Sequence, residues 1–293
     1  MRSVVVTGGN KGIGLAIAKA ILEHADDTRV FLGSRDRDRG ELARASLLKK
    51  QPAWAKRVEV LDLDVASDAS AAAAAQTVRE RLGDTALYGV VNNAGIGSGN
   101  TGLRAVLEVN TLGVRRVCEA FLPLLDPEQG RIVNITSASG PNFVAQCSPE
   151  RQRLFTDPDI EWPTIAALID ESLAIQNGRG TFATAGLGDG NAYGLSKACT
   201  NSDTLLLARE HPNLRINACT PGFIETDLTR PYLASSGRSA ADLGMKPPSE
   251  GARSALFLLF GEPEGNGRYY GSDALRSPLD RYRSPGDPPY EGD

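Results

Sequence analysis

The chain has 293 residues, of which 41% are apolar and 23% charged, and its 32 Lys and Arg against 36 Asp and Glu give a net charge of −4. This length suits one or two domains. A mildly anionic surface without a block of like charge argues against non-specific binding of nucleic acid. Because no apolar run approaches the ~20 residues that span a bilayer, we expect no membrane segment.

The four cysteines are scattered along the chain, with no CxxC pair and no histidine at metal-ligand spacing. This pattern is typical of reduced thiols in the cytosol, so we expect a cytoplasmic protein with no disulfide and no metal site. The first strand is expected to begin at residue 3, which leaves no room before it for a targeting segment.

Predicted strands and helices alternate through most of the chain. Runs rich in Val, Ile and Leu predict strands at residues 3–7, 29–33, 58–62, 88–92, 131–136, 214–219 and near 268–271. Apolar residues at helical spacing predict helices at residues 12–23, 41–50, 69–82, 103–125, 192–210 and 249–260. Near-continuous apolar strands imply burial on both faces. The expected fold is α/β, a Rossmann-like doubly wound parallel sheet of about seven strands with helices on both faces.

A segment at about residues 141–190 interrupts the alternation and is expected to be a helical insertion. Ser148 as N-cap, Pro149 at the first helical position and Glu150 after it predict the start of one helix. Residues 164–177 place apolar side chains on one face and are followed by Gly178, which predicts a second helix. We expect the insertion to belong to a single domain that spans residues 1–276.

The residues after 276 differ in composition from this domain. They combine four prolines with Arg, Asp and Gly, a mixture that cannot bury enough apolar surface to become ordered. We therefore expect residues 277–293 to form a flexible C-terminal tail, although residues 276–282 could still fold back on the domain.

A glycine-rich sequence, TGGNKGIG at residues 7–14, lies between the first predicted strand and the first helix. Its glycines allow a tight turn and let the backbone approach a pyrophosphate at the N-terminus of the helix. Three glycines alone are weak evidence, but on the first strand–helix turn of an alternating chain they predict a dinucleotide site. The residues of this loop expected to bind the cofactor are Gly8, Asn10, Lys11, Gly12, Ile13 and Gly14.

The end of the second strand distinguishes NADPH from NADH. A site for NADH usually has Asp or Glu about 20 residues after the glycine loop, where it binds the ribose 2′-hydroxyl. Here Ser34 stands at this position and Arg35 follows it, while Lys11 provides a second cation. Two cations and no acid favour a 2′-phosphate, and therefore NADPH or NADP+. The alternative is that Arg35 is a solvated side chain beside Asp36.

Two further turns lie at the carboxyl ends of strands, where parallel sheets bind their ligands. Asp62 and Leu63 end the third strand, and Asn93, Ala94 and Gly95 follow the fourth. Asn-rich turns also end strands without any function. In the expected fold we assign all five residues to the cofactor site.

Reduction of a ketone by NADPH requires a proton donor beside the carbonyl oxygen. Tyr193 and Lys197 are four residues apart and therefore share one face of a predicted helix. The lysine charge favours the tyrosinate, which moves a pKa normally about 10 toward working pH. Ser137, after the fifth strand, is placed to hold the substrate oxygen by a hydrogen bond. A YxxxK pair by itself is weak evidence, since such pairs occur on many solvated helices.

Taken in order, TGGNKGIG, NNAG, a mid-helix asparagine, IVNITS and the YxxxK pair resemble the short-chain dehydrogenase/reductase family over nearly the whole chain. The resemblance implies a catalytic tetrad. Tyr193 would be the acid, and Ser137 would orient the carbonyl. Lys197 would hold the nicotinamide ribose and lower the tyrosine pKa. Asn110 would hold a water in a proton relay that reaches Lys197.

The resemblance also implies that a loop after the sixth strand meets the nicotinamide carboxamide. The residues of this loop are Pro221, Gly222, Phe223, Ile224 and Thr226. The long connection before the catalytic tyrosine, CSPE at residues 147–150 and GNKGIGLAI at residues 9–17 resemble the NADPH-dependent carbonyl reductases. Plant reductases of terpenoid and alkaloid ketones are similar. This closer resemblance implies reduction of a ketone, aldehyde or quinone.

The insertion also bears on the oligomeric state. Most relatives with a short connection pair through two long helices, and the apolar face of the inserted helix would cover these. We therefore expect a monomer, as the resemblance to carbonyl reductases also implies. The alternative is that the insertion is a mobile lid over the substrate cleft and leaves the pairing surface free. Two other functions remain open: a dedicated ketone reductase or alcohol dehydrogenase with one narrow substrate, and a non-catalytic NADPH-binding redox sensor. The complete Asn, Ser, Tyr and Lys set argues against the sensor. The expected partner is a small carbonyl compound, with no nucleic acid and no membrane.

Overall fold

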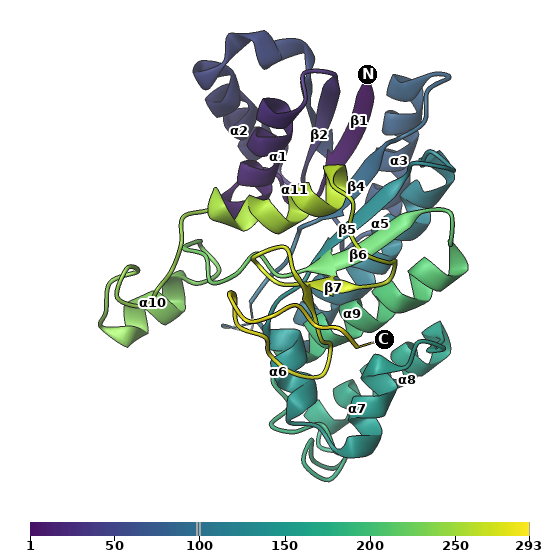
Figure 1. Cartoon of the computed structure of the whole chain (residues 1–293), viewed down its shortest axis with the longest axis vertical. Helices are drawn as coiled ribbons and strands as arrows, with labels where there is room; N and C mark the ends of the chain where they lie inside the picture. The colour runs from purple at the N-terminus through teal and green to yellow at the C-terminus, as the bar shows by residue number, and fades with distance from the viewer. Residues whose placement is uncertain (98, 100, 293) are drawn as a thin grey trace.

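The structure, a computed structural model, describes residues 1–97, 99 and 101–292 (Figure 1). The strands of this part of the chain are β1 (Arg2–Val6), β2 (Thr28–Ser34), β3 (Val58–Asp62), β4 (Gly89–Asn92), β5 (Arg131–Ile135), β6 (Arg215–Cys219), β7 (Tyr269–Tyr270) and β8 (Arg276–Ser277). They form one sheet in the order β3-β2-β1-β4-β5-β6-β7-β8. All neighbours from β3 to β7 are parallel, and β8 is antiparallel to β7. The predicted doubly wound sheet is confirmed, with one short strand more than expected.

Helices cover both faces of this sheet, because successive residues of each strand point to opposite sides. Val5 of β1 lies in one core, whereas Val4 and Val6 lie in the other. One face is covered by α1 (Gly12–His24), α2 (Arg37–Lys50) and α11 (Arg253–Phe260), and the other by α3 (Asp68–Leu82), α5 (Gly113–Phe121) and α9 (Ala192–Glu210). Among the described residues, no helix has both the length and the apolar character needed to cross a membrane.

The helix predicted over residues 103–125 is interrupted in the structure. It consists of α4 (Leu103–Leu107), a π-helical turn (Glu108–Leu112), α5 and a short 3₁₀ turn (Leu122–Leu124). Turns of the π type are rare and occur frequently at functional sites. Asn110 lies at the centre of this one.

The insertion folds into three helices, α6 (Ser139–Ala145), α7 (Pro149–Thr156) and α8 (Trp162–Gln176). α7 begins as predicted, because the Ser148 hydroxyl oxygen accepts a hydrogen bond from the N–H of Arg151 and Pro149 takes the first position. Apolar residues of the three helices form a separate core with one side of α9. Figure 1 shows the insertion beyond α9, on the side away from β1.

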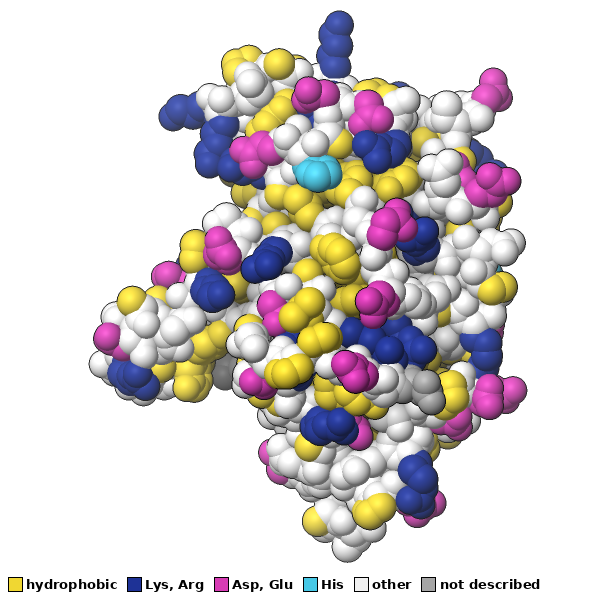
Figure 2. All heavy atoms as spheres, viewed as in Figure 1, with side chains coloured by type: hydrophobic (Ala, Val, Ile, Leu, Met, Phe, Trp, Pro, Cys, Tyr) yellow, Lys and Arg dark blue, Asp and Glu magenta, His cyan; other side chains and the backbone are white. Residues whose placement is uncertain are grey.

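Residues 277–292 lie against the domain, which differs from the expected flexible tail. β8 pairs with β7, and the N–H of Tyr290 donates to the carbonyl oxygen of Arg276 at 3.0 Å. The buried guanidinium of Arg283 pairs with Asp273. In Figure 1 this yellow segment crosses in front of β7, and Figure 2 shows basic and acidic side chains close together over the same region. The final residue, Asp293, lies outside the described residues.

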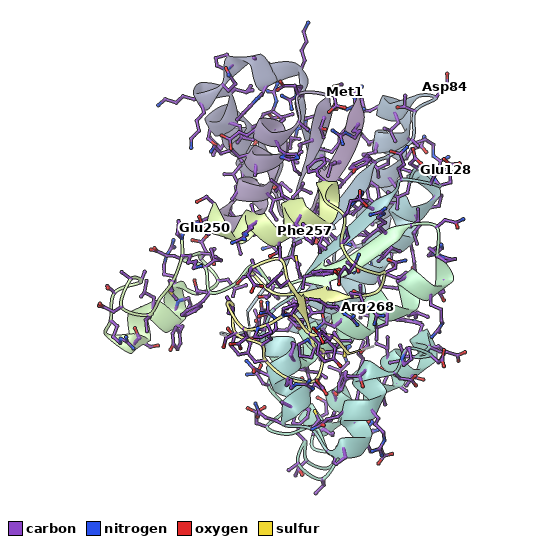
Figure 3. The ribbon with its side chains drawn as sticks, in the orientation of Figure 1. Met1, Asp84, Glu128, Glu250, Phe257 and Arg268 are labelled. Atoms are coloured by element: carbon purple, nitrogen blue, oxygen red, sulfur yellow. The ribbon has the colours of Figure 1, made fainter. Side chains whose placement is uncertain are left out.

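The sheet has two distinct edges along its strand ends. Met1, Asp84 and Glu128 precede β1, β4 and β5, and Figure 3 shows these three labelled residues near the edge where those strands begin. The carboxyl ends of the parallel strands meet at the opposite edge. Apart from Asn110 in the π-helical turn, each group of predicted site residues lies at the end of one of these strands or near the start of α9.

Candidate active site

The loop after β1 leaves no room for a side chain at Gly14. A Cβ there would lie 2.3 Å from the carbonyl oxygen of Gly8 and 2.4 Å from Nδ2 of Asn93. Gly12 has φ +54°, and a Cβ there would meet nothing closer than Thr226 at 3.6 Å. The N-cap residue of α1 makes no side-chain hydrogen bond to the first turn, so the N–H groups of that turn are open to an anion. The pyrophosphate of a dinucleotide fits this loop.

The NNAG turn after β4 supports the glycine loop. Oγ1 of Thr7 accepts hydrogen bonds from the N–H groups of Asn93 and Ala94 at 3.0 and 2.9 Å. The Asn93 amide donates to the carbonyl oxygens of Thr7 and Gly8 at 3.0 and 3.2 Å. Thr7 is missing from the predicted site, although a hydroxyl directly before Gly8 is a feature that the sequence displays. Asn93 and Thr7 therefore shape the loop that would hold the cofactor.

The cations near the end of β2 are arranged differently from the prediction. Arg35 is exposed and has no ion pair within the part of the chain that the structure describes. Lys11 points elsewhere, to Asp227 of the loop after β6, with 2.8 Å between Nζ and Oδ2. Arg37 of α2 pairs with Asp62 at 2.8 Å and brings a guanidinium to the end of β3. The second cation near the end of β2 is thus Arg37, which is not among the residues predicted from the sequence.

The other predicted residue of β3's end, Leu63, is buried. Its N–H donates to the carbonyl oxygen of Ser34 at 3.0 Å, which holds the ends of β2 and β3 together.

The loop after β6 approaches the glycine loop from the other side. A Cβ added to Gly251 would meet Ile13, Pro221 and Ile224 at 3.2 to 3.4 Å, so these three side chains converge.

Ser137 and Tyr193 come together from β5 and α9. Ser137 follows β5, and Tyr193 is the second residue of α9, whose N-cap Asn191 accepts a hydrogen bond from the N–H of Gly194 at 2.7 Å. Burial raises the pKa of Tyr193, and a hydrogen bond with Ser137 opposes that rise. The direction is opposite to the lowering expected from the sequence. The phenol therefore keeps its proton at neutral pH, which is the form of a proton donor.

Lys197 lies one turn further along α9 and is only 4% exposed. Its Nζ donates to the carbonyl oxygen of Ile135 at 3.0 Å and lies 5.6 Å from the ring centroid of Tyr193. Burial lowers the pKa of Lys197 to about 8, so the amine remains mostly protonated at pH 7 but loses its proton at a lower pH than a free lysine does. A Cβ on Gly95 would lie 3.6 Å from Nζ, so the missing side chain leaves space for ribose hydroxyls.

Asn110 is fully buried, and its side chain makes three hydrogen bonds. Its Oδ1 accepts from the N–H of Ile96 at 2.9 Å, and its amide donates to the Ile96 carbonyl oxygen at 2.9 Å and to Oγ of Ser196 at 3.1 Å. These bonds fasten the loop after β4 to α9. The backbone carbonyl oxygen of Asn110 accepts a hydrogen bond from Oγ1 of Thr200 at 2.7 Å.

A cavity of about 230 Å³ opens beside Ser137. Gly222 and Phe223 of the predicted carboxamide loop line it, and Gly222 has φ +90°, which favours glycine. Tyr269 of β7 and Tyr282 of the C-terminal segment line it as well. These two tyrosines are missing from the predicted site, because no motif connects them with Ser137 in the sequence.

Two groups of residues, one suited to binding a dinucleotide and one suited to proton transfer, lie side by side at the carboxyl edge of the sheet. The glycine loop and its supports suit a dinucleotide, and a hydroxyl, a protonated phenol and a buried amine meet next to it. A carbonyl oxygen held by the hydroxyl and the phenol can receive a proton from the phenol.

Comparison with known proteins gives the same assignment. The profile of the short chain dehydrogenase family matches residues 2–149. The chain is 32% identical over 260 residues to (+)-neomenthol dehydrogenase of Arabidopsis thaliana, over 78% of this chain and 84% of that protein. It is 30% identical over 276 residues to carbonyl reductase (NADPH) 1 of Homo sapiens, over 90% of this chain and 92% of that protein.

Solved structures extend the similarity to the whole fold. The structure of salutaridine reductase from Papaver somniferum superposes with a TM-score of 0.76 at 25% identity, and the match covers 92% of this chain and 99% of that one. The family profile covers the glycine loop, Asn110 and Ser137, and the relatives extend the match through α9. This chain is therefore an oxidoreductase of the short-chain dehydrogenase family.

Proposed function

We propose that this protein uses NADPH to reduce the carbonyl of a ketone, aldehyde or quinone to the alcohol, with Tyr193 as proton donor. The main support is the meeting of Ser137, Tyr193 and Lys197 at one end of the sheet, with Ser137 on the cavity wall. The names of the relatives, which include a carbonyl reductase that uses NADPH and a neomenthol dehydrogenase, agree with this chemistry.

The nicotinamide supplies the hydride when the cofactor is bound, and the residues of this chain handle the proton. The carbonyl oxygen of the substrate accepts hydrogen bonds from the hydroxyls of Ser137 and Tyr193. Because burial keeps the phenol protonated, the donor is ready when negative charge develops on that oxygen.

Lys197 and Asn110 serve the same proton transfer. The amine of Lys197 is placed to hold the ribose hydroxyls in the space beside Gly95 and to stabilise the tyrosinate that forms. A water bound to the Asn110 carbonyl oxygen, beside Oγ1 of Thr200, would pass a proton back toward the lysine.

The preference for NADPH rests on the residues after β2. The hydroxyl of Ser34 donates to the carbonyl oxygen of Asp36 at 2.7 Å. The Asp36 carboxylate caps α2 by accepting from the N–H of Arg39 at 3.1 Å and pairs with the Arg39 guanidinium, so both of its oxygens already have a partner. Arg35, which has no ion pair among the described residues, then supplies the charge for a 2′-phosphate.

A panel of ketones, aldehydes and quinones with NADPH, followed by the loss of NADPH absorbance, tests this function. We expect turnover of several compounds. Turnover of one compound alone would indicate a dedicated reductase. If NADPH binds but no carbonyl compound is reduced, the protein is a cofactor-binding sensor and the proposal is wrong.

We also propose that the protein is a monomer. α8 of the insertion packs against α9 and α4. The ring of Trp162 lies 4.8 Å from the guanidinium of Arg115, which pairs with the buried carboxylate of Asp203 at 3.0 Å. The insertion thus covers the helices through which relatives with a short connection pair.

A further inference from the structure

The C-terminal segment, residues 277–290, forms part of the cavity wall beside Ser137. Arg281, Tyr282 and Pro285 of this segment line the cavity together with Phe223 of the loop after β6. The segment follows the last strands of the domain and was expected to be flexible. Its residues instead lie where a carbonyl compound held by Ser137 would extend.

Arg283 anchors this wall. Its guanidinium is 6% exposed and pairs with Asp273, which is 15% exposed, and its Nε donates to Oγ of Ser277 at 3.0 Å. Nη1 donates to the carbonyl oxygens of Ser284 and Asp287 at 3.1 and 2.7 Å. Charge-assisted hydrogen bonds of this kind fix geometry. The wall is therefore built into the fold.

Two aromatic rings line the cavity without touching each other. Phe223 is 42% exposed and Tyr282 is 49% exposed. Phe223 packs edge-on against Tyr232, and in the described part of the chain Tyr282 has no ring contact. Half-exposed rings on a cavity wall offer apolar surface that a ring-bearing ligand would cover.

Tyr282 lines the cavity together with Tyr269 of β7. Burial raises the pKa of Tyr269, and the charges of Tyr282 and Tyr193 add to that rise. Among the described residues, the Tyr282 hydroxyl has no hydrogen-bond partner. It is therefore free to bind a polar group of a ligand.

We propose that Tyr282 is a specificity-determining residue that contacts the substrate and, together with Phe223, selects carbonyl compounds with a flat ring. This inference rests on the proposed reductase function. The ring of Tyr282 supplies the selectivity, and Arg283 acts as a positioning residue that holds the segment in place.

Two ketones with eight carbons each test the inference: acetophenone, which has a ring, and 2-octanone, which is an open chain. In Tyr282→Ala we expect kcat/KM for acetophenone to fall about tenfold relative to that for 2-octanone, the size of one lost aromatic contact. Tyr282→Phe keeps the ring and should keep the unaltered ratio. Tyr290→Ala is the matched control, because Tyr290 belongs to the same segment but does not line this cavity.

Binding of NADPH, measured by fluorescence, should be the same in all four proteins. Equal losses for the two ketones in Tyr282→Ala, or the same change of ratio in Tyr290→Ala, would overturn the inference and leave the reductase function standing. The same holds if the unaltered protein reduces other carbonyl compounds but neither of these ketones. If it reduces no carbonyl compound at all, the proposed function fails and the inference fails with it.

Discussion

Lys197 donates a hydrogen bond of 3.0 Å to the backbone carbonyl oxygen of Ile135, the last residue of β5. This bond fixes the amine beside the tyrosine ring, with Nζ 5.6 Å from the ring centroid of Tyr193. Ser137 follows two residues after Ile135, so the same strand positions both partners of the phenol. The position of Tyr193, the proposed proton donor, and of its two neighbours thus depends on β5 and α9.

Replacement of Tyr193 by Phe removes the proposed proton donor and keeps the ring. We expect the kcat of Tyr193→Phe to fall by about 100-fold or more, the usual contribution of a general acid. Binding of NADPH should remain unchanged, since Lys197 and the glycine loop are intact. Steady-state kinetics with the best compound of the panel and NADPH fluorescence measure the two effects. Turnover near the level of the unaltered protein would show that the tetrad assignment is wrong.

Replacement of Lys197 by Met should stabilise the protein without cofactor. Burial lowers the lysine pKa from 10.5 to about 8, so the folded state binds the proton less tightly than the unfolded chain. The charged lysine then costs about 3 kcal/mol of stability below pH 8, and this cost disappears as the pH rises through about 10.5. Met cannot donate to the Ile135 carbonyl oxygen, and the loss of this hydrogen bond cancels about 1–2 kcal/mol of the stability gained.

The urea midpoint of Lys197→Met should therefore be higher than that of the unaltered protein at pH 7. At a pH near 10.5, the pKa of a free lysine, it should not be higher. Lys49→Met, at an exposed position on α2, is the control and should change stability little at either pH. Loss of stability in Lys197→Met at pH 7 would mean that the bond to Ile135 outweighs the burial of the charge. Reductase activity should be lost in the same variant.

Replacement of Arg35 by Asp should reduce the preference for NADPH. Loss of one charge-assisted phosphate contact costs about 1.5–3 kcal/mol, which is at least about tenfold in affinity. The Kd for NADPH should rise by this factor relative to the Kd for NADH. Lys11→Met is the matched control, because Lys11 pairs with Asp227 and should affect both cofactors alike. A native preference for NADH would contradict the assignment.

The sequence was sufficient to predict the sheet, because each parallel strand is a local run of apolar residues buried on both faces. It was also sufficient to predict that Ser137, Tyr193 and Lys197 lie together, since the strand and helix that present them are regular. It did not predict the π-helical turn at Asn110. That turn accompanies hydrogen bonds to Ile96 and Ser196, which are distant in the chain.

Long-range pairing also explains the other differences. Lys11 lies in the glycine loop, but its partner Asp227 is 216 residues away, so spacing alone could not assign the side chain. The composition of the C-terminal segment predicts flexibility because it contains few apolar residues. In the structure the ion pair between Arg283 and Asp273 holds this segment in place. A count of apolar residues takes no account of such a pair.

The oligomeric state is the last prediction. The Trp162 ring covers the pair formed by Arg115 and Asp203, and apolar side chains of α8 such as Ile165 and Leu168 are buried in the core shared with α9. A partner subunit that used α9 would have to displace this core, and exposure of those side chains would cost more than a new interface of the same area returns. Light scattering at micromolar concentration should give a mass near 31.1 kDa. A mass of twice this value would show that the insertion leaves a pairing surface open.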